Sequence, residues 1–334
     1  MPVSEGKRLR VLVVGFAGHQ GTEYLPVMRR LADVVGGVDP APEADEISHR
    51  HGFPRFATVG EALKRVSFDA ALVTVPHSLH FPLCRELLSH GKHVLKEKPF
   101  AVTAREARRL AELARSVDRS VLVLVQRNFN PAFRFAHRNL RRIGAPYWFS
   151  YDYHMNLPKP TTGWRASREQ ASGGVLLDMG YHLVDALCGM FTAPAAVQAT
   201  FLHCYAEMRE RRLEDLVSLQ WTYPNGTFAG SIRVSRHNHE KVERLSVLGS
   251  EGSLAITPTG AGLYSPGGRE TDRVVVECPK DRIVEDMVAH YLRHLDDRRY
   301  RDAHIERQLA TVRIIDDVYR EQRTEQEHAI DRAS

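Results

Sequence analysis

The sequence contains few cysteines, and their spacing follows no recognised motif. Cys84, Cys188, Cys204 and Cys278 are scattered over 334 residues. This scatter argues against a disulfide framework and against a zinc ribbon, and it is typical of proteins from the reducing cytoplasm. We therefore expect a cytoplasmic protein without disulfides and without a bound metal.

Long apolar runs are also absent. The longest of them, such as residues 121–125, have the length of a β-strand, whereas a membrane-spanning helix needs about 20 apolar residues. Basic residues near the start of the chain precede an apolar run, but that run leads into glycines and lacks a small-residue cleavage site. We expect neither a membrane span nor a signal peptide.

Neither sign of charge dominates the chain. Lys and Arg number 46 and Asp and Glu 41, which gives a formal net charge of +5. Basic and acidic residues alternate, as in residues 296–302, and this is typical of a solvated helix surface rather than a nucleic-acid-binding stripe. We expect no nucleic-acid partner. With 43% hydrophobic residues, a chain of this length can form two domains with cores of their own.

The first motif is a strand followed by a glycine turn and a helix. Residues 10–14 are a β-branched run typical of a buried parallel strand. Gly15, Gly18 and Gly21 follow, and residues 22–31 have the pattern of a helix. Backbone N–H groups and the positive helix end can hold a pyrophosphate in this arrangement. The Gly-x-x-Gly-x-x-Gly spacing departs from the usual Gly-x-Gly-x-x-Gly, so the motif alone is a weak signal.

Asp39 ends the next predicted strand, residues 34–38, at 39 − 21 = 18 residues past the last glycine. A dinucleotide-binding fold places an acidic residue about 20 residues on, where it accepts a hydrogen bond from the adenosine ribose. A carboxylate there repels a 2′-phosphate, so the position favours NAD over NADP. The alternative is a turn residue ahead of Pro40.

Apolar strands and amphipathic helices then alternate up to residue 125. Helices are predicted at 44–51, 59–66, 81–90 and 104–116, and strands at 70–75, 93–95 and 121–125. Repeated strand–helix units predict a doubly wound parallel sheet with ligands at the carboxyl ends of its strands. Residues 74–77 and 96–99 lie at two such ends.

A second motif lies in residues 172–185, where two glycines precede an apolar helical run. The glycines allow close backbone approach or an unusual dihedral angle. Asp178 and His182 stand at i and i+4, so one helical face carries a carboxylate and an imidazole. The alternatives are a pair on the protein surface or two metal ligands, although no third and fourth ligand can be named at a recognised spacing.

Several segments together resemble one known family. Val73-Thr74-Val75-Pro76-His77-Ser78-Leu79-His80 and Gly91-Lys92-His93-Val94-Leu95-Lys96-Glu97-Lys98-Pro99 are similar to the signature of the glucose–fructose oxidoreductase, inositol dehydrogenase and rhizopine-catabolism (Gfo/Idh/MocA) family. Arg127-Asn128-Phe129-Asn130-Pro131, Trp164-Arg165 and residues 172–185 continue the resemblance in the same order, so it covers essentially the whole chain.

The resemblance implies site residues. In that family Lys98 sits beside the reacting oxygen, Glu97 and Pro76 lie along the cofactor, and the Lys98–Pro99 bond is cis. His77 stands where the family commonly has asparagine. The expected cofactor-binding residues are Gly15, Gly18, Gly21, Asp39, Thr74, Pro76, His77, His80, Glu97 and Lys98.

The pattern changes from residue 147 onward to longer alternating segments. Residues 197–205, 215–223, 227–236 and 242–248 are predicted strands, and Asn225-Gly226 is a strong hairpin signal. The prediction is an open, mostly antiparallel sheet with helices on one face, followed by helices at 282–296 and 304–321. In the resembling family the other face is a dimer interface, so we expect a homodimer or homotetramer.

The expected architecture is therefore an α/β chain in two domains. Residues 1–127 are the NAD(P)-binding Rossmann domain, and residues 128–334 are an α+β domain for substrate binding and oligomerisation. The expected substrate residues are Arg127, Tyr153, Trp164, Arg165, Asp178 and His182. Tyr153 and His154 are neighbours on a strand, so at most one of them faces the site. The loop 156–163 is expected to shape the pocket.

These residues predict an NAD-dependent dehydrogenase or ketoreductase for a sugar, amino sugar, cyclitol or related polyol. His182 can accept the hydroxyl proton, Asp178 can orient the imidazole ring or bind a neighbouring hydroxyl, and Lys98 can stabilise the alkoxide. One alternative is a reductase of a C=C bond or an imine on the same fold. Another is a regulatory protein that senses NAD without turnover.

Overall fold

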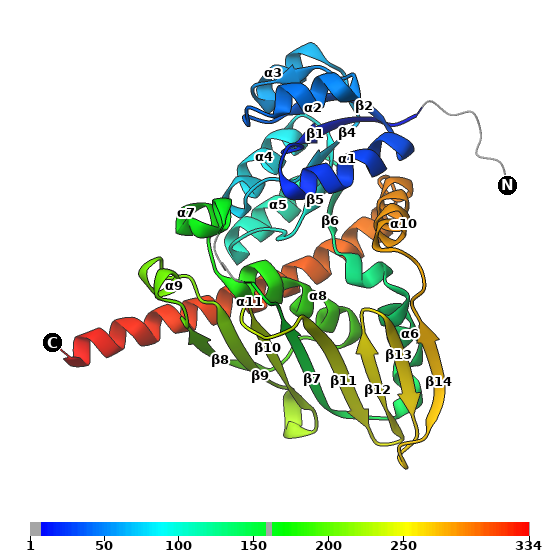
Figure 1. Ribbon diagram of the computed structural model, residues 1–334, viewed down its shortest axis with the longest axis vertical. Coiled ribbons are helices and arrows are strands. Elements are labelled where there is room, and N and C mark those ends of the chain that lie inside the picture. Colours follow the sequence, from blue (N-terminus) through cyan, green and yellow to red (C-terminus); the bar gives the residue numbers. More distant parts are fainter. Residues whose placement is uncertain (1–7, 158–161, 334) are drawn as a thin grey trace. The chain divides into compact units, whose positions relative to one another are not determined.

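The computed structural model describes residues 8–157 and 162–333. The chain divides into two compact units (Figure 1). The first comprises Met1–Ala101, Arg105–Leu124 and Lys280–Glu306, and the second comprises Val102–Ala104, Val125–Pro279 and Arg307–Ser334. The predicted domain boundary after residue 127 lies close to the end of the segment Arg105–Leu124. The prediction did not place Lys280–Glu306 in the first unit.

The first unit contains a six-stranded parallel sheet with the order β3-β2-β1-β4-β5-β6. Its strands are β1 Arg10–Val14, β2 Asp33–Val38, β3 Arg55–Phe56, β4 Ala70–Val73, β5 His93–Glu97 and β6 Val121–Leu124. This is the strand order of the doubly wound dinucleotide-binding fold. The predicted fold of the N-terminal half is confirmed.

Helices follow the strands of this sheet. They are α1 His19–Leu31, α2 Ala44–His51, α3 Val59–Arg65, α4 His77–Ser89, α5 Ala104–Ser116 and α10 Lys280–Arg293. Helix α1 begins directly after its N-cap Gly18, and α4 begins directly after Pro76. Both helices start earlier than the sequence pattern suggested. Two helix N-termini therefore lie immediately beside the strand ends that carry the predicted cofactor residues.

The C-terminal segment of the first unit closes one edge of the sheet beside β6. The Ser120 hydroxyl donates a hydrogen bond to the Leu295 carbonyl oxygen, and the Val123 N–H donates to His304 Nε2 at 2.9 Å. The Arg301 guanidinium pairs with Asp118 at 2.5 Å. Residues from the C-terminal part of the chain therefore bond to β6 and to the residues just before it.

The second unit contains an eight-stranded sheet with the order β14-β13-β12-β11-β7-β10-β9-β8, drawn as a row of arrows in Figure 1. The β7–β10 pair is parallel and the other pairs are antiparallel. The strands are β7 Pro146–His154, β8 Ala196–Leu202, β9 Leu216–Thr222, β10 Ala229–Ser235, β11 Val242–Gly249, β12 Gly252–Thr257, β13 Gly260–Tyr264 and β14 Glu270–Val275. The predicted mostly antiparallel sheet is confirmed.

The hairpin predicted at Asn225-Gly226 connects β9 and β10. Both turn residues have positive φ, 67° for Asn225 and 65° for Gly226, a conformation that asparagine and glycine adopt at low cost. The sequence signal at this turn therefore had a direct steric cause.

Helices of the second unit include α6 Pro131–Asn139, α7 Arg168–Ala171, α8 Tyr181–Met190, α9 Ala206–Glu210 and the greater part of α11 Arg298–Ala333. Short 3₁₀ turns lie at Gln126–Phe129, Leu140–Ile143, Gly163–Ala166 and Pro224–Gly226, and Leu176–Gly180 is a π-helical turn. Helix α6 packs on β12, β13 and β14. Within the described residues, no helix is both long enough and apolar enough to cross a membrane.

Candidate functional site

The glycine turn after β1 leaves no space for side chains at two of its three glycines. A Cβ atom on Gly15 would lie 2.5 Å from the Thr74 carbonyl oxygen, and Gly15 has φ +80°. A Cβ on Gly21 would lie 2.2 Å from the Gly15 carbonyl oxygen. A Cβ on Gly18 would meet only that oxygen, at 3.6 Å. Gly15 and Gly21 are therefore required by the turn itself, and Gly18 keeps the N-terminus of α1 open.

Asp39 bonds back onto this turn. Its buried carboxylate accepts the Ala17 N–H at 2.8 Å and the Ala41 N–H at 2.9 Å. The nearby Arg55 guanidinium donates to the Asp39 carbonyl oxygen and pairs with Asp45 at 2.8 Å. Asp39 is thus more than a turn residue ahead of Pro40, because its side chain joins the ends of β1 and β2.

The end of β4 supports the same turn. The Thr74 hydroxyl donates to the carbonyl oxygens of Val14 and Gly15 at 3.1 and 2.9 Å. His77 and His80 lie buried in the first turn of α4. Burial, with repulsion from Lys96, His77 and Lys98, lowers the pKa of His80 well below its usual range, so its ring is neutral at pH 7.

The Lys96–Pro99 segment at the end of β5 is held from inside the protein. The Lys98–Pro99 peptide bond is cis, as the resemblance implied. Buried Lys96 donates to the carbonyl oxygens of Pro99 and Phe100 at 2.5 and 2.7 Å, and burial lowers its pKa to about 8. Lys96 therefore positions the residues around Lys98, a role that the sequence analysis did not assign.

Glu97, the residue before Lys98, is also fixed. The Tyr24 hydroxyl donates to one carboxylate oxygen at 2.7 Å, and the Lys98 N–H donates to the other at 3.1 Å. Burial raises the pKa of the Glu97 carboxyl, although the charge of Lys98 and the Tyr24 hydroxyl oppose this shift. The predicted cofactor residues of the first unit thus gather at the carboxyl ends of β1, β2, β4 and β5.

In the second unit, the glycines ahead of Asp178 are explained by close packing. A Cβ on Gly174 would lie 2.1 Å from the Glu214 carbonyl oxygen, and one on Gly173 would lie 2.6 Å from the Tyr319 hydroxyl. The buried Glu214 carboxylate accepts the N–H groups of Gly174 and Leu176 and the Tyr319 hydroxyl. Close approach, rather than an unusual dihedral angle, is therefore the reason for these glycines.

Asp178 lies in the π-helical turn Leu176–Gly180 and is buried. Its Oδ2 atom accepts Arg165 Nε at 3.0 Å and Arg236 Nη2 at 2.9 Å. Arg236, next after β10, is almost completely buried, whereas Arg165 is partly exposed. Two guanidinium groups on one oxygen suit a carboxylate that keeps its charge. The geometry favours a binding and orienting role for Asp178 over proton transfer.

His182 lies half-buried in the first turn of α8. A hydrogen bond to a distant residue holds that turn, because the hydroxyl of neighbouring Tyr181 donates to Gln308 Oε1 at 2.5 Å. Gln308 in turn donates to Asp185 at 2.6 Å, and Asn128 donates to the other Asp185 oxygen at 3.0 Å. The backbone that carries His182 is thus fixed by a buried polar network.

Arg127 lies beside Tyr153 and in a buried ion pair. Its Nε and Nη2 atoms donate to the two oxygens of Glu243 at 2.7 and 2.9 Å, and the Tyr151 hydroxyl donates to Glu243 at 2.9 Å. Burial by itself would lower the pKa of Arg127, but the charge of Glu243 raises it by more, so the net shift is upward. The Arg127 guanidinium lies 5.1 Å from the Tyr153 ring centroid. Much of its charge is thus already compensated.

Tyr153 and His154 point to opposite sides of β7. Tyr153 shares its side with Arg127. Burial raises the pKa of Tyr153, the charge of Arg127 opposes this shift, and the charges of Glu243 and Asp178 add to it. His154 instead contacts the Ser235 hydroxyl at 2.8 Å and Asp152 at 3.8 Å. Of the two candidates, Tyr153 is the one near the other predicted substrate residues.

Trp164 and Arg165 form the 3₁₀ turn Gly163–Ala166, where the Arg165 guanidinium lies 4.4 Å from the Trp164 ring centroid. The structure therefore brings Trp164, Arg165 and Asp178 together. Residues 158–161 of the loop that was expected to shape the pocket lie outside the described residues.

Two family models match the chain. Residues 9–125 match the GFO/IDH/MocA model described as an oxidoreductase family with an NAD-binding Rossmann fold, and residues 139–255 match the GFO/IDH/MocA C-terminal domain. The chain belongs to the GFO/IDH/MocA oxidoreductase family. The resemblance noted from the motifs is confirmed.

Curated relatives of this GFO/IDH/MocA chain include sugar and cyclitol enzymes. The 1,5-anhydro-D-fructose reductase of Ensifer adhaerens is 31% identical over 178 residues, 52% of this chain and 52% of its own. The scyllo-inositol 2-dehydrogenase (NADP(+)) of Bacillus subtilis is 27% identical over 165 residues, 48% of this chain and 50% of its own. The matched region spans about half the length of these relatives.

A solved structure is similar over nearly the whole GFO/IDH/MocA chain. The crystal structure of GenD2 from gentamicin A biosynthesis, in complex with NAD, has a TM-score of 0.82 at 22% identity and covers 96% of this chain and 95% of its own. At this identity the similarity establishes the fold.

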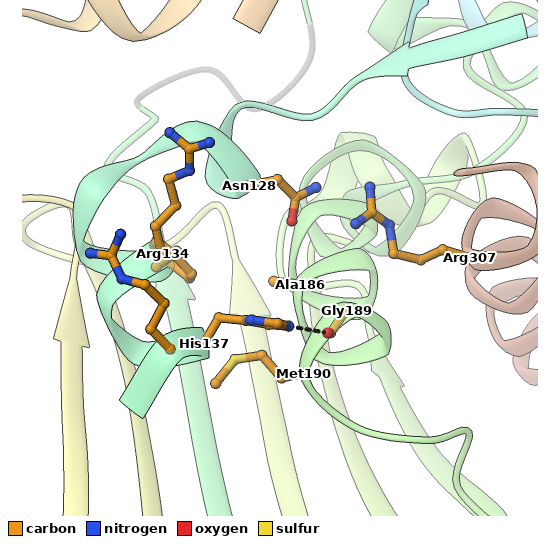
Figure 2. Close-up of a pocket in the computed structure, with 9 residues that line it drawn as sticks. Asn128, Arg134, His137, Ala186, Gly189, Met190 and Arg307 are labelled. Carbon is orange, nitrogen blue, oxygen red and sulfur yellow. Dashed lines mark hydrogen bonds between the residues drawn. The ribbon is translucent and has the colours of Figure 1, made fainter. Parts of the chain in front are cut away.

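A cavity of about 520 Å³ lies elsewhere in the second unit of this GFO/IDH/MocA chain (Figure 2). Figure 2 shows basic side chains around it, and His137 Nε2 lies 3.1 Å from the Gly189 carbonyl oxygen. The lining residues are Asn128, Phe133, Arg134, His137, Arg138, Ala186, Gly189, Met190 and Arg307. The predicted substrate residues do not line this cavity.

The sequence analysis did not identify three charged residues that contact predicted site residues or their neighbours. Arg236 bonds to Asp178, and Glu243 bonds to Arg127. Lys96 bonds to the carbonyl oxygens of the two residues that follow Lys98. Lys96 and Glu243 lie in strands, and Arg236 directly follows one. A charged residue at a position that is expected to be buried is the sequence signal that could have identified them.

Proposed function

We propose that this protein is an NAD-dependent oxidoreductase that transfers a hydride between nicotinamide and a secondary alcohol or ketone of a sugar, amino sugar or cyclitol. The observation that carries the proposal is the glycine turn with the Asp39 carboxylate bonded to it. This arrangement offers N–H groups for a pyrophosphate and an acceptor for the ribose hydroxyls.

The residues of the first unit fit a dinucleotide. Gly15 and Gly21 keep the turn free of side chains, and the first turn of α1 contains no acidic residue that would repel a phosphate. The carboxylate of Asp39 favours an unphosphorylated ribose, hence NAD. Thr74, Pro76, His77, His80, Glu97 and Lys98 are the further residues proposed to surround the cofactor.

The chemistry of the reaction would be shared between the cofactor and the side chains. When bound, NAD supplies the hydride acceptor. We assign His182 as the group that accepts the hydroxyl proton during oxidation and returns it during reduction, because imidazole titrates near neutral pH. Lys98 stabilises negative charge on the reacting oxygen, and Asp178 accepts a hydrogen bond from a neighbouring hydroxyl.

The substrate class rests on the side chains of the second unit and on the curated relatives. Tyr153, Trp164 and Arg165 add an aromatic surface and hydrogen-bond donors near Asp178, which suits a hydroxyl-rich ring. Arg127 contributes to this surface with its charge compensated by Glu243, so it favours a neutral substrate over an anionic one. Two relatives are named for anhydrofructose and scyllo-inositol.

We further propose that the protein forms a homodimer or homotetramer in the cytoplasm. Trp148 of β7, Leu202 of β8 and Val275 of β14 are large apolar side chains that remain exposed in the single chain. They lie on strands of the large sheet, the part of the fold expected to meet a second copy. The scattered cysteines, all of which are free thiols, favour a reducing compartment.

The test is nicotinamide absorbance during incubation with NAD and a panel of sugars, amino sugars and cyclitols. Turnover should fall by about 10²-fold or more in Lys98→Ala and in His182→Ala, while both variants still bind NADH by fluorescence. NADH binding without turnover across the panel and in both reaction directions would contradict the proposed activity and favour a sensor.

A further inference from the structure

Three strand ends of the second unit bring a thiol, a carboxylate and an imidazole together. Cys204 follows β8, Asp215 precedes β9 and His237 follows β10. These strands are neighbours, and Leu202 of β8 and Ser235 of β10 both pair with Leu216 of β9. The three residues therefore lie just beyond one level of the sheet, although they are far apart in sequence.

The potential ligand atoms of this cluster are close to one another. The Cys204 Sγ, an Asp215 carboxylate oxygen and a His237 ring nitrogen all lie within 4.8 Å of one another. His237 Nε2 is 3.2 Å from Asp215 Oδ2. This separation matches two ligands of one tetrahedral ion, because metal–nitrogen and metal–oxygen bonds of about 2.0–2.2 Å place their ligand atoms about 3.3 Å apart.

The cluster is also preformed. The Cys204 and Tyr205 N–H groups donate to the two oxygens of fully buried Asp215, at 2.8 and 3.0 Å. The Tyr205 ring packs against the His237 ring in a tilted arrangement, with centroids 3.6 Å apart. The carboxylate and the imidazole are thus oriented by neighbours, as ligating residues of metal sites are, while Cys204 lies at the surface where an ion can enter.

We propose that Cys204, Asp215 and His237 bind one zinc-type divalent cation, with water as the fourth ligand. Thiolate, imidazole and carboxylate are the three ligand types that Zn²⁺ accepts in tetrahedral sites. Binding forms a metal–sulfur bond as the thiol proton leaves to solvent, so uptake of one ion releases one proton from Cys204.

The ion would stiffen the strand end that carries Arg236. The Arg236 N–H donates to the Asp215 carbonyl oxygen at 3.0 Å, and its guanidinium holds Asp178. Arg236 thus lies between a ligand of the proposed ion and a residue of the candidate site. The ion acts as a structural support for that site, separate from the chemistry proposed for His182 and Lys98.

Cobalt(II) is the direct probe, because a cobalt–thiolate bond has a charge-transfer band in the near ultraviolet. The full-length protein, stripped with a chelator, is titrated with Co²⁺ and then with Zn²⁺. We expect one equivalent per chain, a charge-transfer band that Zn²⁺ abolishes by displacement, and a higher thermal midpoint with Zn²⁺. The matched variants are Cys204→Ser and Cys278→Ser, with His237→Asn as a second ligand variant.

Cys204→Ser should lose the band and bind at least about 10-fold more weakly, since loss of an outer-shell partner alone weakens metal affinity by about 10- to 100-fold. Cys278→Ser should match the wild type. Circular dichroism before metal addition shows that each variant is folded. The proposal is overturned if the band is missing in the wild type, persists in Cys204→Ser, or disappears equally in Cys278→Ser. These outcomes do not depend on whether the oxidoreductase proposal holds.

Discussion

The contact between Asp178 and Arg236 makes a strong prediction about stability. Replacing Asp178 with asparagine preserves the size of the side chain but removes its negative charge. The buried Arg236 guanidinium then faces a neutral amide. Removing one partner of a buried ion pair costs about 3–5 kcal/mol, because the charge that stays buried has lost its counter-charge. We expect Asp178→Asn to lower the free energy of unfolding of the second unit by about 3 kcal/mol.

The other partner of Asp178 provides the matched control. Arg165 is 33% exposed, so water can solvate it and its ion pair is screened. Arg165→Gln should cost less than about 1 kcal/mol. In the double variant Asp178→Asn/Arg236→Met the buried charge is absent as well, so more than about 1 kcal/mol of stability should return relative to Asp178→Asn alone.

Urea unfolding followed by tryptophan fluorescence measures these differences. Trp148, Trp164 and Trp221 are the three tryptophans of the chain, and all lie in the second unit. A loss of about 3 kcal/mol corresponds to a thermal midpoint about 6–12 °C lower. If Asp178→Asn loses no more stability than Arg165→Gln, the buried pair does not have the energetic role assigned to it here.

Further predictions concern the first unit. Asp39→Ala should reduce the preference for NAD over NADP by about 10-fold or more, measured as the ratio of the two dissociation constants; an unchanged ratio would exclude the assigned role of Asp39. Gly15→Ala should abolish NADH binding or folding because its Cβ would overlap Thr74, whereas Gly18→Ala should fold normally; equal damage in both variants would contradict this account of the turn. Burial lowers the pKa of Lys96 from 10.5 to about 8, so the unfolded chain binds that proton more tightly and the contribution of Lys96 to stability rises with pH. Between about pH 7 and pH 9.5 the wild type should gain about 2 kcal/mol relative to Lys96→Met in urea unfolding; a constant difference would show that Lys96 does not titrate in this range.

The sequence was informative where local pattern and steric need coincide. Continuous apolar runs predicted the parallel strands, and Asn225-Gly226 predicted the hairpin, because positive φ at both turn residues selects those side chains. Gly15 and Gly21 were predicted as cofactor-binding residues from the spacing of glycines after a strand, and the structure adds a steric reason for them, because a Cβ atom at either position would overlap backbone atoms. Helix α4 was predicted to begin at residue 81, whereas it begins at His77, directly after its N-cap Pro76.

The contacts between distant segments could not be predicted. Asp178 and His182 were predicted to share a helical face, but the π-helical turn at Leu176–Gly180 and the two arginines on Asp178 depend on tertiary packing. Arg236 and Glu243 reach the site only because β7, β10 and β11 are adjacent in the sheet. No local spacing rule relates residues brought together by strand order.

The first unit is not a continuous piece of sequence, and this limits how the protein could be taken apart. A fragment ending at residue 127 would keep β6 and the residues just before it but lose Leu295, Arg301 and His304, which bond to that segment. Such a fragment would expose apolar surface and be prone to aggregate. For the same reason, a single crossover between two related genes could not exchange one whole unit, so recombination would have to replace the C-terminal segment together with the N-terminal one.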